Sequence, residues 1–310
     1  MSLKQKEEIT IWAFKDGKKG HENQIDALIH ELKLRKKVHV SEIDCSRGLK
    51  NWPKNFKKSP DILIGAGNKT HHFMLQVKNK LKAPKTIVLM RPSFKPTQLF
   101  NIAIVPEMDR YILYTPKNVL RTKGVLCRYY KIKPAPGTGI IVIGGNSKHY
   151  SFSKKLISYQ LKMVLEKFSD IQWKVTTSPR SPNFDIPEHT GNAEFFNWKD
   201  VDKGWLTNAM SNSEYAIVTP DSVSSVYEAL STNSKTIVFQ LDLHHNQHGQ
   251  INTKVTKNID LLKNNQEVGY VNVLRNGIFG KMQGIKINLP KERVPLEESK
   301  RVVDLLMDML

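Results

Sequence analysis

The sequence has 310 residues, 39% of them hydrophobic, and its 48 Lys and Arg against 29 Asp and Glu give a formal charge of +19. This length predicts two domains, and the ordinary hydrophobic fraction excludes a largely disordered chain. Only Cys45 and Cys127 are present, far apart in sequence, which excludes a disulfide scaffold and a Cys-based zinc site. We expect a protein of the reducing cytoplasm, without a signal segment or membrane span.

The first half of the chain alternates short Ile- and Val-rich runs with amphipathic stretches, which indicates strands alternating with helices. The predicted strands are 9–14, 38–43, 61–64, 86–90 and 102–105, and the predicted helices are 21–34 and 69–82. The Pro- and Gly-rich segment Lys131–Gly139 interrupts both patterns, so we interpret it as an interdomain linker.

The same alternation restarts after this segment. Strands are predicted at 140–143, 172–176, 215–218 and 236–239, with helices at 153–168, 201–211, 222–230 and after Gly249. Strands and helices joined by short connections predict two α/β domains with parallel, Rossmann-like sheets facing each other across a cleft. We place the domains at 1–134 and 135–295, with an amphipathic helix at 296–310 that can pack against either of them.

The charge is concentrated in the predicted first domain. Residues 1–134 contain 28 Lys and Arg and 11 Asp and Glu, a net charge of +17, whereas residues 135–310 have a net charge of +2. Such a basic half typically faces phosphate, in nucleic acid or in anionic lipid, and the alternative is a solvated Lys-rich surface without a partner.

Polar residues gather in the loop after the first predicted strand. Gly17 and Gly20 allow a tight turn there, and the start of the next helix carries Asp16, His21, Glu22, Asn23 and Gln24. His21 is our candidate general base, with Asp16 as the alternative base or as the residue that orients it. The plainer interpretation is a helix start with incidental polar residues.

A diglycine turn opens the predicted second domain. Free N–H groups of Gly144 and Gly145 before a helix would favour an anion such as a diphosphate, and Asn146 and Ser147 add side-chain donors. Arg180, in a loop after another strand, could pair with the same diphosphate or remain a solvated arginine.

The third polar loop follows the strand at 215–218 and leads into a helix. It carries Thr219, Asp221, Ser222 and Ser224, and an ordinary helix cap would explain only one of them. Glu228, one to two turns inside the helix, could bind the two hydroxyls of a ribose.

Three tempting patterns carry less weight. The segment Gly65–Thr70 lacks the third glycine of a dinucleotide fingerprint, although Gly65, Asn68 and His71 could line a cleft. Asp200-Val-Asp202 is a formal D-x-D, which we interpret as a helix cap. His244 and His248 have the spacing of helix-borne metal ligands but lack a third ligand, so we expect no metal site.

Taken together, the motifs resemble those of the mitochondrial-fission ELM-like family. The four matching segments are Asp16–Gln24, Gly144–Ser147, Ser178–Pro182 and Thr219–Ala229, in that order. Bacterial members of this family are regarded as glycosyltransferases of lipopolysaccharide core assembly, whereas plant members recruit a dynamin-related protein. The arrangement is also similar to the GT-B transferase that adds N-acetylglucosamine in lipid II synthesis, except that Lys18 and Lys19 replace its small residues.

This resemblance implies a GT-B glycosyltransferase that needs no metal or cofactor, moves a sugar from a nucleotide sugar, UDP-linked in our interpretation, and inverts the anomeric carbon. The catalytic residues would be His21 and Asp16. The acceptor-binding residues would be Lys18, Lys19, Gly20, Asn23 and Gln24. The donor-binding residues would be Gly144, Gly145, Asn146, Ser147, Ser178, Arg180, Thr219, Asp221, Ser222, Ser224 and Glu228.

The basic first domain would then bind an acidic, lipid-linked acceptor at the cytoplasmic surface of the inner membrane. Trp52 and Phe56, within Asn51–Lys58, and Phe94, within Arg91–Lys95, are interleaved with lysines and would face the bilayer unless they are core residues. The alternatives are a nucleotide-sugar epimerase, a non-catalytic membrane adaptor and a nucleic-acid-binding protein, the last without a recognisable binding motif.

Overall fold

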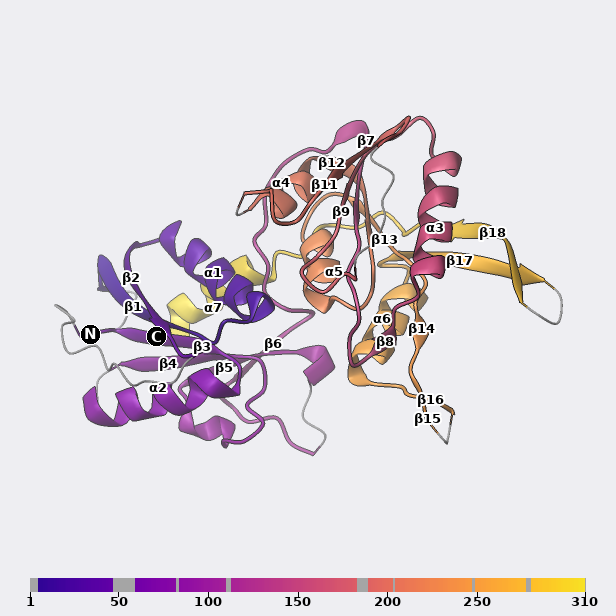
Figure 1. The fold of residues 1–310 in the computed structure, drawn as a ribbon. Coiled ribbons are helices and arrows are strands. Elements are labelled where there is room, and N and C mark those ends of the chain that lie inside the picture. The colour runs from indigo at the N-terminus through magenta and orange to yellow at the C-terminus, as the bar shows by residue number, and fades with distance from the viewer. Residues whose placement is uncertain are drawn as a thin grey trace. The chain divides into compact units, whose positions relative to one another are not determined.

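The computed structural model describes residues 5–46, 59–81, 84–109, 113–182, 189–202, 204–246, 249–276 and 280–309. The chain divides into two units, a first unit of Met1–Arg128 with Glu297–Leu310, and a second unit of Tyr129–Leu296. Both are α/β units with Rossmann-like parallel sheets (Figure 1). In the part of the chain that is described, no helix has the length and hydropathy of a membrane span.

The first unit is built on six parallel strands in the order β2-β1-β3-β4-β5-β6. Its elements are β1 (Glu8–Lys15), α1 (Lys19–Lys33), β2 (Lys37–Asp44), β3 (Ile62–Ala66), α2 (Asn68–Leu81), β4 (Lys85–Leu89), η2 (Thr97–Leu99), β5 (Ile102–Pro106), η3 (Glu107–Asp109), β6 (Val119–Thr122) and α7 (Glu298–Met309). The strand order reverses between β1 and β3, so the carboxyl ends of these two strands mark the usual ligand position of an open parallel sheet.

The hydrophobic run of β1 is explained by burial on both faces of the sheet. Ile9, Ile11 and Ala13 point to one core, and Trp12 and Phe14 point to the other, as the two-residue period of a strand requires.

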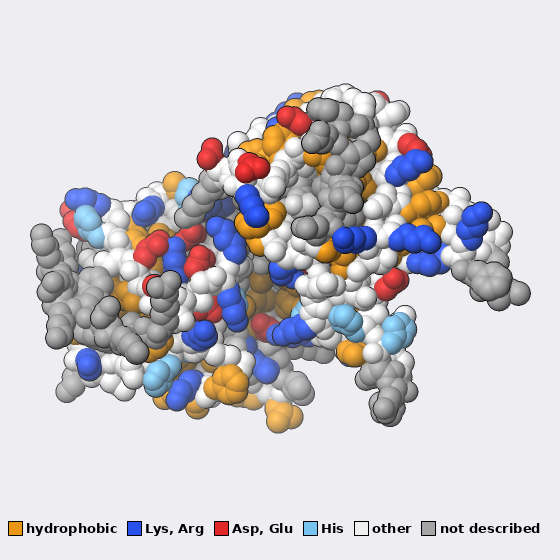
Figure 2. Space-filling model, viewed as in Figure 1, with side chains coloured by type: hydrophobic (Ala, Val, Ile, Leu, Met, Phe, Trp, Pro, Cys, Tyr) orange, Lys and Arg blue, Asp and Glu red, His pale blue; other side chains and the backbone are white. Residues whose placement is uncertain are grey.

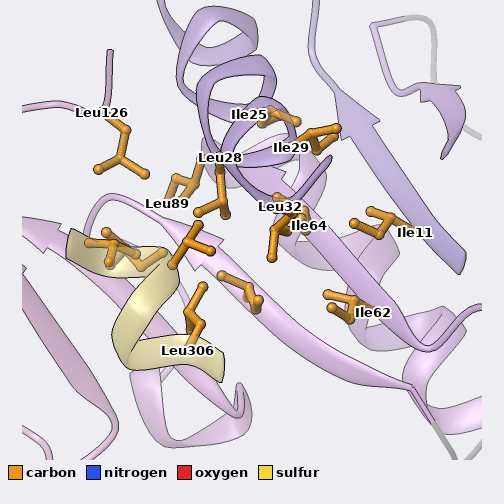
Figure 3. Packing of buried hydrophobic residues seen from close by; sticks show 14 of the residues in the cluster. Ile11, Ile25, Leu28, Ile29, Leu32, Ile62, Ile64, Leu89, Leu126 and Leu306 are labelled. Atoms are coloured by element: carbon orange, nitrogen blue, oxygen red, sulfur yellow. The ribbon is translucent and has the colours of Figure 1, made fainter. Parts of the chain in front are cut away.

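Helices α1 and α7 cover the first of these two faces. Figure 3 shows Leu28 and Leu32 of α1 and Leu306 of α7 around Ile64 and Leu89 of the sheet. Helix α2 contributes to the opposite core. The C-terminal helix therefore completes the first unit rather than standing alone.

The second unit has an eight-stranded sheet in the order β10-β11-β9-β7-β12-β13-β17-β18. Its elements are β7 (Ala135–Val142), β8 (Tyr150–Ser151), α3 (Lys154–Lys167), β9 (Gln172–Thr176), β10 (His189–Thr190), β11 (Ala193–Phe196), α4 (Trp205–Asn212), β12 (Ser213–Val218), α5 (Val223–Leu230), β13 (Lys235–Val238), β14 (Asp242–Leu243), β15 (His245–Asn246), β16 (Gly249–Gln250), α6 (Lys254–Asn264), β17 (Gly269–Asn276) and β18 (Lys281–Asn288). The inner pairs are parallel, and the two edge pairs, β10–β11 and β17–β18, are antiparallel.

The two units divide between Arg128 and Tyr129, a few residues before the predicted boundary after residue 134. Strand β7 already begins at Ala135, inside the segment that we interpreted as a linker, because Gly139 and its neighbours pair with β9 and β12. With α7 counted in the first unit, that unit has 28 Lys and Arg and 15 Asp and Glu, a net charge of +13, and the second unit has +6. The asymmetry is therefore weaker than the sequence division indicated.

Candidate functional site

A carboxylate and an imidazole meet at the carboxyl end of β1, in the first unit. Asp16 Oδ2 lies 2.9 Å from His21 Nδ1, and Asp16 Oδ1 accepts a hydrogen bond from the backbone N–H of Lys18 at 3.1 Å. The Asp16 side chain is 1% exposed and that of His21 is 21% exposed, so the imidazole is the member of the pair that reaches solvent. The structure thus brings together the two predicted catalytic residues.

Gly67, which sequence reasoning missed, closes over this pair from the end of β3. Its φ of +87° favours glycine, and a Cβ at this position would lie 2.6 Å from His21 Nδ1 and 2.8 Å from Asp16 Oδ2. The neighbouring positions of β1 and β3 in the sheet bring the two loops together. Its place directly after a buried strand, at the reversal of strand order, is the signal that could have identified it.

The predicted acceptor-binding residues differ in their accessibility. Lys18 and Lys19 are exposed at the start of α1, whereas Gln24 is buried and its amide donates to the backbone oxygen of Gly20 at 3.2 Å. Gln24 therefore stabilises the first turn of α1, and we withdraw it as an acceptor contact. Asn23 is half-buried on the same helix.

His71, on the first turn of α2, is a buried histidine near the Asp16–His21 pair. It is 2% exposed, its ring centroid lies 5.4 Å from that of Phe100, and neither ring nitrogen has a hydrogen-bond partner in the structure. Burial, with a smaller contribution from the neighbouring His21, lowers the pKa of His71 to about 4. His71 is thus a neutral imidazole at pH 7.

In the second unit, the diglycine loop after β7 is held by the loop after β12. The N–H of Gly144 donates to Thr219 Oγ1 at 2.7 Å, and the N–H of Gly145 donates to Asp221 Oδ2 at 3.1 Å. The prediction that these two N–H groups are free for a diphosphate is therefore wrong. Both N–H groups instead attach the loop after β7 to the loop after β12.

Asp221 and Arg180 form an ion pair at the same place. Arg180 Nη2 lies 2.9 Å from Asp221 Oδ2, the Asp221 side chain is fully buried, and that of Arg180 is 45% exposed. Burial raises the pKa of Asp221, while hydrogen bonds from Thr219 and Gly145 and the charge of Arg180 act in the opposite direction. A buried carboxylate repels phosphate, so we withdraw Asp221 as a diphosphate contact and assign it to holding this loop.

The remaining predicted donor residues of the β7 and β9 loops lie around this ion pair. Ser178 closes its own loop with Ser181, whose hydroxyl donates to the backbone oxygen of Gly144 at 2.6 Å. Ser147 Oγ accepts the N–H groups that follow it, and Asn146 is exposed. Of these side chains, Asn146 is the one that the structure leaves at the surface.

The third predicted loop connects β12 to helix α5. Ser222 caps the helix by accepting the N–H of Ser225, and Ser224 is half-buried in the first turn. Glu228 lies further along α5 and is 8% exposed. Ser222 therefore fulfils the structural role that the sequence offered as the plainer alternative, while Ser224 and Glu228 remain predictions.

Several predictions concern other parts of the chain. Trp52 and Phe56 lie outside the described residues, as does His248. His244 is not on a helix, and its Nε2 lies 2.8 Å from the backbone oxygen of Ser147, so the helical metal-ligand spacing does not apply. Among the described residues, no group of three His, Cys, Asp or Glu side chains could hold a metal ion.

Known proteins are similar to the chain in sequence and in fold. The family model described as mitochondrial fission ELM1 matches residues 19–307. An uncharacterized protein of Rickettsia prowazekii is 22% identical, over 74% of this chain and 83% of its own length.

Two glycosyltransferases are among the similar solved structures. A UDP-glucosyltransferase from Polygonum tinctorium that glucosylates indoxyl is 10% identical, with a TM-score of 0.51, over 97% of this chain and 93% of its own. A spinosyn forosaminyltransferase is also 10% identical, with a TM-score of 0.51, over 97% and 91%. The chain therefore has the GT-B fold of these transferases, as the motif resemblance predicted.

Proposed function

The chain belongs to the mitochondrial fission ELM1 family, and from this premise we propose that it is a glycosyltransferase. Its donor is a nucleotide sugar, UDP-linked in our proposal, and its acceptor is an acidic, lipid-linked saccharide of the lipopolysaccharide core type. The reaction takes place at the cytoplasmic surface of the inner membrane, needs no metal and inverts the anomeric carbon.

The Asp16–His21 pair is the observation that carries this proposal. Asp16 faces Nδ1 of His21, which leaves Nε2 as the nitrogen that accepts the proton of the acceptor hydroxyl. The acceptor oxygen bonds to the anomeric carbon while the bond from that carbon to the donor phosphate breaks, and the nucleoside diphosphate leaves with the bonding electrons. The buried carboxylate stabilises the imidazolium that forms.

On the donor side, the proposal uses the first turns of α5 and the exposed part of Arg180. Ser224 lies where the N–H groups and dipole of α5 favour a phosphate, and Arg180 keeps guanidinium donors beyond the one that faces Asp221. Glu228 would bind the ribose hydroxyls. These groups would stabilise the departing diphosphate in place of a metal.

The test begins with a thermal-shift screen of the full chain against UDP, GDP, ADP and CMP sugars. We expect one nucleotide to raise the melting temperature of the wild type and of His21→Ala, but not of Glu228→Ala. Glu166→Ala changes an exposed glutamate of α3 and serves as the matched control for Glu228.

The second stage measures transfer to a lipid-linked acceptor. Both His21→Ala and Glu228→Ala should lose product, whereas His72→Ala, an exposed histidine of α2, should keep it. Unimpaired turnover in both site variants would overturn the assignment. A donor that is altered without any acceptor would indicate an epimerase, and an unaltered cellular phenotype in both variants would indicate an adaptor.

A further inference from the structure

Two loops of the first unit expose large hydrophobic side chains to solvent. Phe94 is 81% exposed and Leu99 is 44% exposed in the segment between β4 and β5, and Leu113 is 99% exposed and Tyr114 62% exposed before β6. The Asn118 amide donates to the backbone oxygens of Thr97 and Phe100, both at 2.9 Å, which holds the two segments side by side. We call residues 91–99 together with 113–117 the docking rim.

The chain around the docking rim is basic to an unusual degree. Residues 62–106 contain seven Lys and Arg without one Asp or Glu, and residues 110–128 of the same unit contain five more, also without an acidic residue. Arg91, Lys95 and Lys117 are exposed within the rim itself. Figure 2 shows hydrophobic side chains beside Lys and Arg along the lower edge of the first unit.

Two intervening acids offset only part of this charge, since residues 91–117 contain four Lys and Arg against two Asp and Glu. Glu107 and Asp109, in η3, lie between the two acid-free stretches, and Glu107 interacts electrostatically with Arg301 of α7. Hydrophobic side chains therefore protrude from a surface whose nearby charges are mainly positive.

A chain of contacts connects the docking rim with the Asp16–His21 pair. The backbone N–H of Ser93 donates to Asn68 Oδ1 at 3.1 Å, and Asn68 directly follows Gly67, which closes over His21. All strands of this sheet are parallel, so the loops after β1, β3, β4 and β5 lie at the same edge. The Arg91–Phe94 part of the rim therefore lies at the same edge of the sheet as the loop of the proposed base.

We propose that the docking rim binds the surface of an anionic lipid bilayer, with Phe94, Leu113 and Tyr114 entering the interface and Arg91, Lys95 and Lys117 facing lipid phosphates. The phosphates and bases of a nucleic acid would engage the cations and the aromatic rings but not the aliphatic Leu99 and Leu113, whereas a lipid surface accepts all of these side chains. The inference rests on the proposed function only in that a lipid-linked acceptor would be presented at this surface.

Vesicle co-sedimentation of the full chain tests this inference. The wild type should bind vesicles of phosphatidylcholine mixed with phosphatidylglycerol, with weaker binding at high salt and little binding to phosphatidylcholine alone. Phe94→Ser combined with Leu113→Ser should lower the partition coefficient about tenfold or more. Leu261→Ser combined with Leu289→Ser is the matched control, since these leucines are 54% and 52% exposed in the second unit.

A fluorescence measurement keeps the inference testable if a serine variant folds poorly. The emission of Phe94→Trp should shift to shorter wavelength on anionic vesicles, and that of Leu261→Trp should not. Absence of wild-type binding, or equal binding by the rim and control variants, would overturn the docking rim.

A transfer assay with a detergent-solubilised acceptor separates the two proposals. Rim variants that retain transfer but lose vesicle binding support the docking rim. A wild-type chain that binds vesicles through the rim but transfers no sugar contradicts the proposed function and leaves the docking rim in place.

Discussion

Each unit places an aspartate in the loop after a central strand, but the two aspartates have different partners. Asp16 pairs with His21, whose imidazole is partly exposed to solvent. Asp221 pairs with the guanidinium of Arg180 and with the backbone of the diglycine loop. The difference teaches that an aspartate at this loop position can orient a partly exposed imidazole in one unit and hold a neighbouring loop in the other.

The largest expected effect is on the transfer rate and concerns the Asp16–His21 pair. His21→Ala should lower the transfer rate about a thousandfold, because the acceptor hydroxyl loses its base. Asp16→Asn should lower it as well, and raising the pH should restore part of either loss because the acceptor itself ionises more. Rates of nucleotide release over a pH series check this, and a flat profile with wild-type rates would contradict it.

The next prediction concerns the glycine above the pair. Gly67→Ala should reduce turnover about a hundredfold, because the new methyl group displaces His21 from its position. Gly204→Ala is the control, since Gly204 also has a positive φ, +94°, but has open space around its Cβ position. Both variants should lose stability because of the positive φ, Gly67→Ala more than Gly204→Ala because of its close contacts, and equal loss of activity in both would contradict the displacement of His21.

A stability effect should follow from His71. Its pKa is lowered from 6.5 to about 4 in the folded state, so the unfolded state binds more protons between these values. The resulting stability is fully present above pH 6.5 and is lost as the pH falls toward 4, by about 2 kcal/mol at pH 5. Urea unfolding of His71→Phe should lack this loss, whereas His72→Phe, at an exposed position, should retain it.

The smallest expected effect concerns the second aspartate. Arg180→Ala should destabilise the chain by about 1 kcal/mol at pH 8, a value reduced by the exposure of Arg180. Since burial already raises the pKa of Asp221, the loss should diminish as the pH falls and the carboxyl is protonated. Adding Asp221→Asn should remove this pH dependence, and a pH-independent loss in Arg180→Ala would contradict the coupling.

The sequence predicts much of the fold because its strands are buried. The runs in β1, β3 and β5 are apolar on both faces, which is typical of parallel strands between helices. Buried and exposed residues alternate along β17, but no strand is predicted from the sequence after the helix that follows Gly249, and the hairpin of β17 and β18 is therefore missed. Strand β6 is short, half-exposed and likewise missed.

The site is less predictable, because it depends on which loops meet. Asp16 and His21 are five residues apart, and local spacing suffices to predict their contact. Gly67 contacts this pair only because β3 lies beside β1 in the first sheet. In the same way, Asp221 contacts Gly145 only because β12 lies beside β7 in the second sheet. Sequence alone predicted phosphate ligands where the folded chain uses the same donors for its own loops.

The most direct test of the central claim is a single-turnover transfer assay with a labelled nucleotide sugar and a lipid-linked acceptor. We predict labelled lipid product from the wild type, none from His21→Ala despite retained nucleotide binding, and none from Glu228→Ala with nucleotide binding lost. Product formation at the wild-type rate in both variants would contradict the account.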